Sequence, residues 1–179
     1  MKALFFITVI SLLGLGEIHA QNKISYGAVA GYHNLIGKVK VSENNKSNKV
    51  STGVSGLYAG FFLEYQLSEK FSFQPEVHFA QTYKDGKSSN ELIFPMFVKY
   101  YVDSKLSLQA GATFDLILDK TEGANVFGFG AGFGLAYDIT DKLFASSRYT
   151  FGLSNRLKDA PVGRTIKFDI FQIGLGYRF

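Results

Sequence analysis

The feature that most constrains this chain is an alternation of apolar residues with polar residues or glycine that recurs about eight times. In residues 127–137 every odd position is apolar, while the even positions from 128 to 134 are all glycine. Successive side chains of a β-strand point to opposite faces, so this period of two predicts strands with two chemically different faces. The pattern covers residues 24–31, 57–65, 71–80, 94–101, 106–116, 127–138, 143–152 and 171–179.

The links between these segments alternate in length. Short turns are expected near residues 68–70, 103–105 and 140–142, and longer polar links near residues 34–53, 84–91, 119–125 and 154–165. Short turns at one end and long loops at the other are typical of bacterial outer-membrane barrels. We therefore predict an all-β fold, a closed antiparallel up-and-down transmembrane β-barrel of about eight strands.

The first 20 residues are predicted to be a signal peptide. Lys2 is followed by an almost unbroken apolar run over residues 3–15, and Ala20 offers a small residue for cleavage. The run is too short to span a membrane comfortably, which takes about 20 apolar residues. We expect export, cleavage after Ala20 and one barrel domain over residues 21–179 in the bacterial outer membrane.

The two faces of the predicted strands differ in charge, and this difference sets their orientation. One face is almost purely apolar, with Ser147 and Pro75 as exceptions. Turning the other face outward would place Lys99 and Arg148 in lipid, at about 2–4 kcal/mol each near the midplane. We therefore expect a lumen filled by a polar network of Glu64, Glu76, His78, Lys99, Asp115, Arg148 and Arg178.

This network is expected in layers, because buried charges must be paired. Glu64, Lys99 and Arg178 belong to a lower layer, and Glu76, His78 and Arg148 to mid-height. The alternate glycines from 128 to 134 are expected to leave room on one wall for large inward residues such as Phe62, Phe97 or Tyr101, or to line a small cavity.

Aromatic residues from different strands are predicted to lie at one level. Amphipathic rings favour the membrane interface, so these residues form a periplasmic girdle. Its members are Tyr26, Tyr65, Phe71, Tyr100, Tyr137, Tyr177 and Phe179.

The first long link is basic. It contains Lys38, Lys40, Lys46 and Lys49, with Glu43 as the single acid. A solvated extracellular loop is one interpretation, and contact with lipopolysaccharide phosphates or an external protein partner is the other, because lysines favour such anions. The alternation of Lys38 and Lys40 with valines also suggests a strand that continues beyond the membrane and exposes an edge.

Three segments resemble a known family. They are GLYAGFFLEYQLSEKFSFQPEV (residues 56–77), FPMFVKYYV (94–102) and IGLGYRF (173–179). The chain resembles the PorT-like, "porin family" outer-membrane β-barrel domain over its mature length. The resemblance implies fold and location and says little about activity. The final strand with its terminal aromatic is also similar to the signal by which the barrel-assembly machinery recognises such proteins.

Composition and motifs favour a non-enzymatic protein without a cofactor. The chain has no cysteine, and its net charge of +4 gives no reason to expect nucleic acid as a partner. Glu76, His78, Ser72 and Ser146 leave a lipid-modifying enzyme open, and no metal-ligand spacing is present. We expect a structural or surface-interaction protein, with a passive small-solute channel or a soluble lipocalin-like carrier as alternatives.

Overall fold

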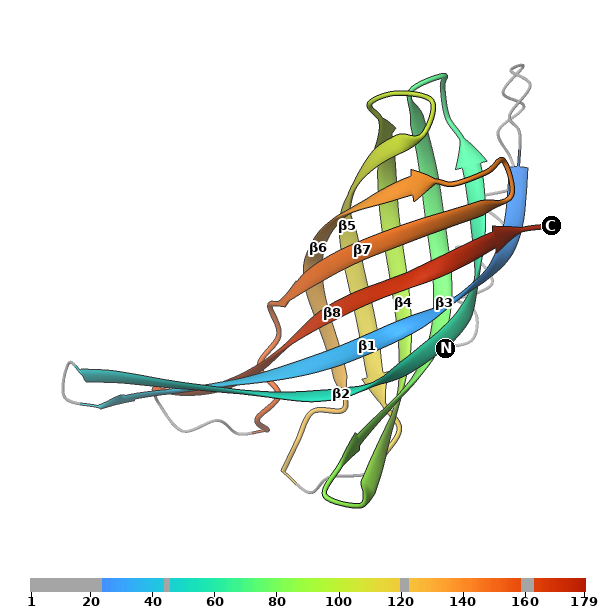
Figure 1. Cartoon of the computed structure of the whole chain (residues 1–179). Helices are drawn as coiled ribbons and strands as arrows, with labels where there is room; N and C mark the ends of the chain where they lie inside the picture. The colour runs from blue at the N-terminus through green and yellow to red at the C-terminus, as the bar shows by residue number, and fades with distance from the viewer. Residues whose placement is uncertain (1–23, 44–45, 120–122, 159–162) are drawn as a thin grey trace, which may run out of the picture.

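The computed structural model is a single closed barrel of eight antiparallel strands (Figure 1). It describes residues 24–43, 46–119, 123–158 and 163–179. The predicted signal peptide and its cleavage after Ala20 lie outside these residues. The strands are β1 (Ile24–Glu43), β2 (Lys46–Gln66), β3 (Phe71–Lys84), β4 (Lys87–Tyr101), β5 (Leu106–Ile117), β6 (Phe127–Asp138), β7 (Leu143–Gly152) and β8 (Arg164–Arg178).

Each strand pairs with its neighbour in sequence, and β1 closes the ring by pairing with β8. The closing ladder runs from Gly27 opposite Arg178 to Val41 opposite Arg164. Closure gives every strand of the wall two partners, which satisfies backbone groups where no water is available. The predicted up-and-down barrel is confirmed. No helix among the described residues is long and apolar enough to cross a membrane.

The two faces of the wall divide as the cost of burying charge in lipid predicts. Phe61, Phe133 and Leu175 point outward and are more than half exposed. Lys99, on the inward face of β4, is fully buried in the lumen. In β3 and β4 buried and more exposed positions alternate through most of the strand. An apolar band therefore surrounds a polar interior, the arrangement of outer-membrane barrels.

Three tight turns connect the strands at one end of the barrel, at the places expected. In each turn a side-chain oxygen accepts a hydrogen bond from the backbone N–H of the next strand's first residue: Ser68 from Phe71, Asp103 from Leu106 and Thr140 from Leu143. The N–H groups of Leu106 and Lys105 hold the pKa of the exposed Asp103 carboxyl below its usual range. Local capping of this kind favours short turns.

The aromatic residues assigned to the periplasmic girdle lie beside these turns. Tyr100 pairs with Phe71 across β3 and β4, and their ring centroids are 5.2 Å apart. Tyr26 and Phe179 approach to 5.7 Å where β8 ends against β1. The remaining members, Tyr65, Tyr137 and Tyr177, occupy the strand positions opposite Ile24, Leu106 and Leu143.

Two of the four predicted long links were wrong, because strands occupy most of them. The expected link over residues 34–53 is mainly the outer part of β1 and β2, which stay paired from Ile24 opposite Tyr65 to Glu43 opposite Lys46. The expected link over residues 84–91 contains a two-residue hairpin at Asp85 and Gly86. Both residues have positive φ, 50° and 73°, as tight hairpins require.

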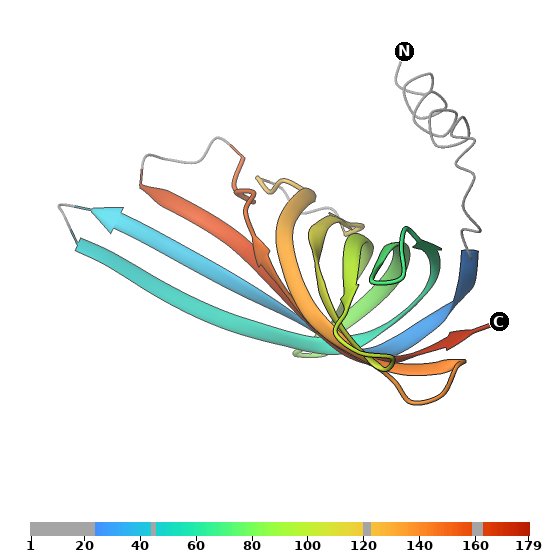
Figure 2. The same ribbon diagram turned by 90° about the horizontal axis from the view of Figure 1, so that it is seen from above.

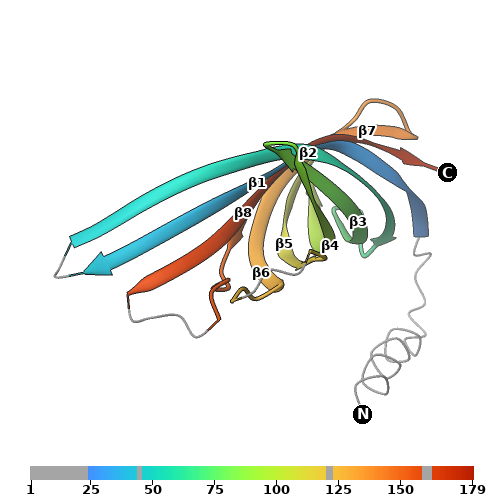
Figure 3. The same cartoon turned by 90° about the horizontal axis from the view of Figure 1, so that it is seen from below.

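As a result, β1, β2 and β8 run on together beyond the other strands (Figures 2 and 3). β2 pairs with β3 only from Ser55 onward, and β8 pairs with β7 only from Ile170 onward. We call residues 164–169, 35–43 and 46–54 of these strands the three-stranded extension.

The glycines of β6 make room for large inward side chains, although not for all those expected. A Cβ at Gly132 would lie 2.7 Å from the Phe97 ring, and one at Gly134 would lie 2.8 Å from Arg148. Gly128 faces Arg156 instead. The expectation that Phe62 and Tyr101 pack here was wrong, since Phe62 lies against Gly27 and Tyr101 bonds to Glu64.

The contact between Gly132 and Phe97 predicts that valine substitutions at two neighbouring positions of β6 differ in their effect on stability. Gly132→Val should destabilise the barrel by about 1–3 kcal/mol, because Phe97 is buried and has little space to move. Ala131→Val, which points outward, should change stability by less than about 0.5 kcal/mol. Urea unfolding in lipid vesicles, followed by heat-modifiable gel mobility, measures both. Equal losses would contradict the packing described.

Candidate functional site

The centre of the lumen is organised around the carboxylate of Glu76. Arg148 Nη2 lies 2.6 Å from Glu76 Oε1, and His78 Nε2 lies 2.6 Å from Glu76 Oε2. Gln74 donates a further bond of 2.7 Å to Oε1. All four side chains are buried. Buried charges are tolerable only when paired and hydrogen-bonded, so this cluster holds β3 and β7 together across the lumen.

Glutamine side chains extend this cluster to other strands. Arg148 donates to Gln109 on β5 at 2.6 Å. Gln172 on β8 lies 3.4 Å from His78 Nδ1 and 3.5 Å from His33 Nδ1. The Arg148 guanidinium lies over the face of the Phe97 ring, 5.0 Å from the ring centroid. The network therefore spans the barrel from wall to wall.

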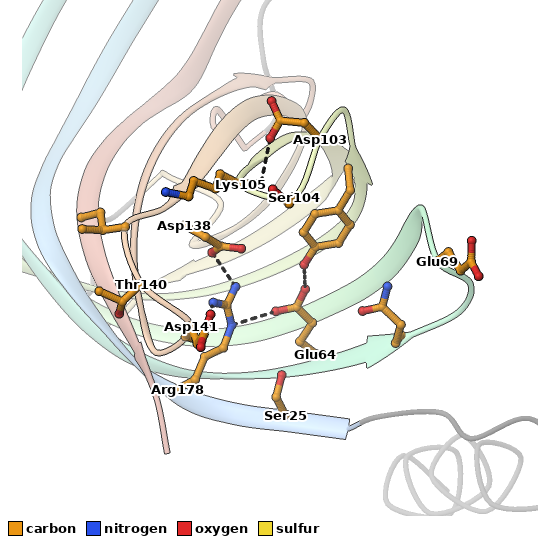
Figure 4. Close-up of a pocket in the computed structure, with 13 residues that line it drawn as sticks. Ser25, Glu64, Glu69, Asp103, Ser104, Lys105, Asp138, Thr140, Asp141 and Arg178 are labelled. Atoms are coloured by element: carbon orange, nitrogen blue, oxygen red, sulfur yellow. Dashed lines mark hydrogen bonds and ion pairs between the residues drawn. The ribbon is translucent and has the colours of Figure 1, made fainter.

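A second ionic layer lies nearer the periplasmic turns, around Glu64. This carboxylate accepts hydrogen bonds from Lys99 at 3.0 Å, from Ser72 at 2.8 Å and from Tyr101. Arg178 lies 3.5 Å from its other oxygen and also donates to Asp138 at 2.8 Å. Figure 4 shows Arg178 between the two carboxylates.

Below this layer the barrel opens into a vestibule of about 870 Å³ (Figure 4). Its wall carries five carboxylates and two basic side chains, namely Glu64, Glu69, Asp103, Asp138 and Asp141 against Lys105 and Arg178. Above the ionic layer the lumen is filled by buried rings. Phe62 and Phe144 meet edge to face at 5.4 Å, and both are at most 2% exposed. Packed side chains therefore separate water and small solutes in the vestibule from the rest of the lumen.

A third layer near the opposite end contains ionic groups that the sequence analysis missed. Asp115 bonds to Arg156, a residue of the link between β7 and β8 whose guanidinium reaches back into the barrel. Arg156 also donates to the Val126 carbonyl at 3.1 Å. His33 lies 3.3 Å from Glu91. Arg156 lies in a loop, where no alternation of residues could have predicted that its side chain points inward. His33 and Glu91 could have been found, because they continue the alternation of inward-facing positions along β1 and β4.

The structure thus brings the predicted lumen residues together in three separate layers. Glu64, Lys99 and Arg178 meet in the lower one, and Glu76, His78 and Arg148 meet at mid-height. Asp115 joins neither group.

The possible catalytic grouping around His78 is not assembled in the described part of the chain. His78 Nε2 faces Glu76, the acid of that grouping, but its Nδ1 faces Gln172 and not a serine. Ser72 donates to Glu64 instead. A serine nucleophile needs hydrogen-bond contact with its base. Residues 24–43, 46–119, 123–158 and 163–179 also contain no group of three ligands suited to a metal ion.

The lysines predicted in an extracellular loop lie in strands, which corrects that prediction. Lys38 and Lys40 belong to β1, and Lys46 and Lys49 to β2. The alternation of lysine with valine permits this extension, because the backbone of β1 pairs with both β2 and β8. Lys38 forms an ion pair with Asp169 of β8, another residue that the sequence analysis missed.

Comparison with known proteins agrees with this architecture. The sequence matches the family described as outer membrane protein beta-barrel domain over residues 5–179. The chain belongs to this family. No curated protein sequence matches it.

Three solved structures of low sequence identity align with most of the chain. AlkL, determined by solid-state NMR in lipid bilayers, aligns with a TM-score of 0.50 and 14% identity, covering 92% of this chain and 94% of AlkL. Ail of Yersinia pestis aligns with 17% identity and a TM-score of 0.49, covering 87% and 98%. OprG of Pseudomonas aeruginosa aligns with 13% identity and a TM-score of 0.47, covering 91% and 99%. The likeness to AlkL shows that the two chains share the barrel fold.

The Glu76–Arg148 pair predicts strong coupling between the two positions. Glu76→Gln or Arg148→Met alone should cost about 3–5 kcal/mol of unfolding free energy, because each leaves a buried charge unpaired. The double variant should cost much less than the sum of the two. Unfolding in vesicles measures this cycle, and Lys142→Met, at an exposed turn, provides the control. Additive losses would show that the pair does not act as a unit.

Proposed function

We propose that this protein is a non-enzymatic barrel of the outer membrane that serves a structural or surface-interaction role through its extracellular side. The observation that carries the proposal is a contrast within the molecule. The lumen is filled with paired charges and rings, while the three-stranded extension continues past the wall. An eight-stranded barrel is just wide enough for its own side chains, so its free surface lies outside the lumen.

The extension offers a specific means of contact with an external protein partner. β2 residues 46–54 pair with β1 but not with β3, so one edge of this segment carries unpaired backbone groups. An exposed strand edge is a template for pairing with a strand of another chain.

The proposal extends to the subgroup, the export and the assembly of the chain. We propose that the chain belongs to the PorT-like subgroup that it resembles, and that a signal peptide cut after Ala20 directs its export. β8 ends with Tyr177 and Arg178, and Phe179, which follows the strand, packs on Tyr26 at 5.7 Å. We propose that the barrel-assembly machinery recognises this strand. Membrane lipid and lipopolysaccharide are the proposed surroundings.

The filled lumen predicts the absence of a steady ion current. The purified processed chain in planar bilayers should show no stable open level, because Phe97 and Phe144 are buried between ionic layers. The double variant Phe97→Ala/Phe144→Ala should show open current levels, because the lumen then lacks the two aromatic rings that fill it. Phe133→Ala, on the lipid-facing side of β6, should behave like the unaltered chain. A stable large conductance from the unaltered chain would favour the small-solute channel instead.

The surface role predicts that the tip of the β1–β2 hairpin matters in cells. Replacing residues 40–49 with Asn-Gly joins Val39 to Val50, which face each other, and leaves the pairing of residues 24–39 intact. A deletion strain and cells with this shortened chain should both attach to surfaces less well than cells with the unaltered chain, while sensitivity to small hydrophilic antibiotics stays unchanged. Full restoration of attachment by the shortened chain would overturn the proposed role of the hairpin.

A further inference from the structure

The outward face of the extension carries four lysines that come together only through strand pairing. Lys40 of β1 lies directly opposite Lys49 of β2. Lys38 lies directly opposite Lys167 of β8. These four residues line one hollow of about 390 Å³, together with Ser51, Thr165 and Phe151. We call the four side chains the lysine patch.

This arrangement is electrostatically unfavourable by itself. Side chains directly opposite across antiparallel strands have Cβ atoms about 4.5–5.5 Å apart, and like charges at such positions are destabilising. The patch contains two such pairs in neighbouring rows. Native sheets normally place opposite charges there, so the patch suits an anion that lies between the lysines.

One carboxylate faces the patch, and its oxygens already have partners. Asp169 Oδ2 accepts bonds from Lys38 and from the Tyr149 hydroxyl, the latter at 2.5 Å. Its Oδ1 accepts the Gly152 N–H at 3.0 Å. Among the described side chains, which do not include those of residues 43–47, no carboxylate lies within ion-pair distance of Lys40, Lys49 or Lys167. Four lysines against one aspartate leave a local charge of 4 − 1 = +3.

The position of the patch identifies the kind of anion. From Tyr26 in the girdle, β1 advances 12 residues to Lys38, which spans roughly 29 Å of the membrane normal at about 3.4 Å per residue and a tilt of about 45°. The apolar band of such barrels is about 25 Å tall. Lys38 therefore lies at the outer headgroup level, with Lys40 and Lys49 just above it.

Apolar side chains lie on the hydrocarbon side of the patch. On the outward face of β8, Phe171 and Ile173 follow Asp169 toward the membrane, and on β1 Ile36 precedes Lys38. Lys38 also lies over the rings of Tyr149 and Phe151, at 5.9 and 5.8 Å. A ligand that carries both phosphates and acyl chains would contact the lysine patch and these apolar side chains at the same time.

We propose that the lysine patch binds the phosphates of a phosphorylated glycolipid of the outer leaflet, with its acyl chains against β1 and β8. The inference rests on the proposed surface role and gives that role its lipid partner. Lys38 is fixed by Asp169, and Lys40, Lys49 and Lys167 supply the charge that holds phosphate. A bisphosphorylated lipid A has the required chemistry.

Titration with lipid A tests this proposal. The processed chain in neutral detergent is titrated with bisphosphorylated lipid A, and bound lipid is counted by native mass spectrometry. Lys40→Gln/Lys49→Gln/Lys167→Gln should weaken binding by roughly 10-fold or more, since each lysine near an anionic surface contributes a several-fold effect. Lys70→Gln/Lys105→Gln/Lys142→Gln, which removes equal charge from the periplasmic turns, should change binding less than 2-fold.

Four further measurements show whether a loss of binding comes from the phosphates, from the lysine patch or from misfolding. Lipid A without phosphates should bind as weakly as the patch variant does, and inorganic phosphate alone should not compete at millimolar concentration. Heat-modifiable mobility establishes that both triple variants are folded. Equal binding by the dephosphorylated lipid, or equal losses in both variants, would overturn the proposal. Binding of a soluble sulfated oligosaccharide without lipid A would also overturn it, in favour of a soluble polyanion.

The experiments distinguish failure of the lipid A proposal from failure of the proposed surface role. If lipid A binding fails while the shortened hairpin still abolishes attachment, the lipid proposal falls and the surface role stands. If a steady conductance appears, the surface role falls irrespective of lipid A.

Discussion

The pairing of β1 with β8 is the constraint on which the rest of this structure depends. It joins the two ends of the described chain through a ladder that begins at Gly27 and Arg178 and runs to Val41 and Arg164. Hydrocarbon offers no hydrogen bonds, so an open edge within the membrane would leave backbone groups unsatisfied. Closure removes that cost. It also encloses an interior that lipid cannot reach, and the inward face can therefore carry charge.

The enclosed charges set the limits on function. Three ionic layers are centred on Glu64, on Glu76 and on the Asp115–Arg156 pair, with buried aromatic rings packed between the lower two. Each layer draws its members from several strands, so the wall and its contents stabilise each other. Beyond the vestibule, a small barrel packed in this way has little internal space for a substrate. Its vestibule, its outer end and its surface are the regions left for contact with other molecules.

The outer end differs from the periplasmic end for a topological reason. Turns at the periplasmic end are short and capped by Ser68, Asp103 and Thr140. At the other end β1, β2 and β8 continue as a sheet after β3 and β7 have left it. The same backbone pairing that closes the barrel thus also projects a strand edge and a basic face beyond it.

The sequence by itself determined the class of fold and the orientation of the two faces, because period-two alternation and the cost of burying charge in lipid act locally along each strand. It also indicated which charges point inward. Only the tertiary structure decided how those charges pair, since Arg156 enters the lumen from a link without periodicity. It likewise decided that Lys40 faces Lys49 and that Lys38 faces Lys167, because register between strands depends on closure of the whole ring.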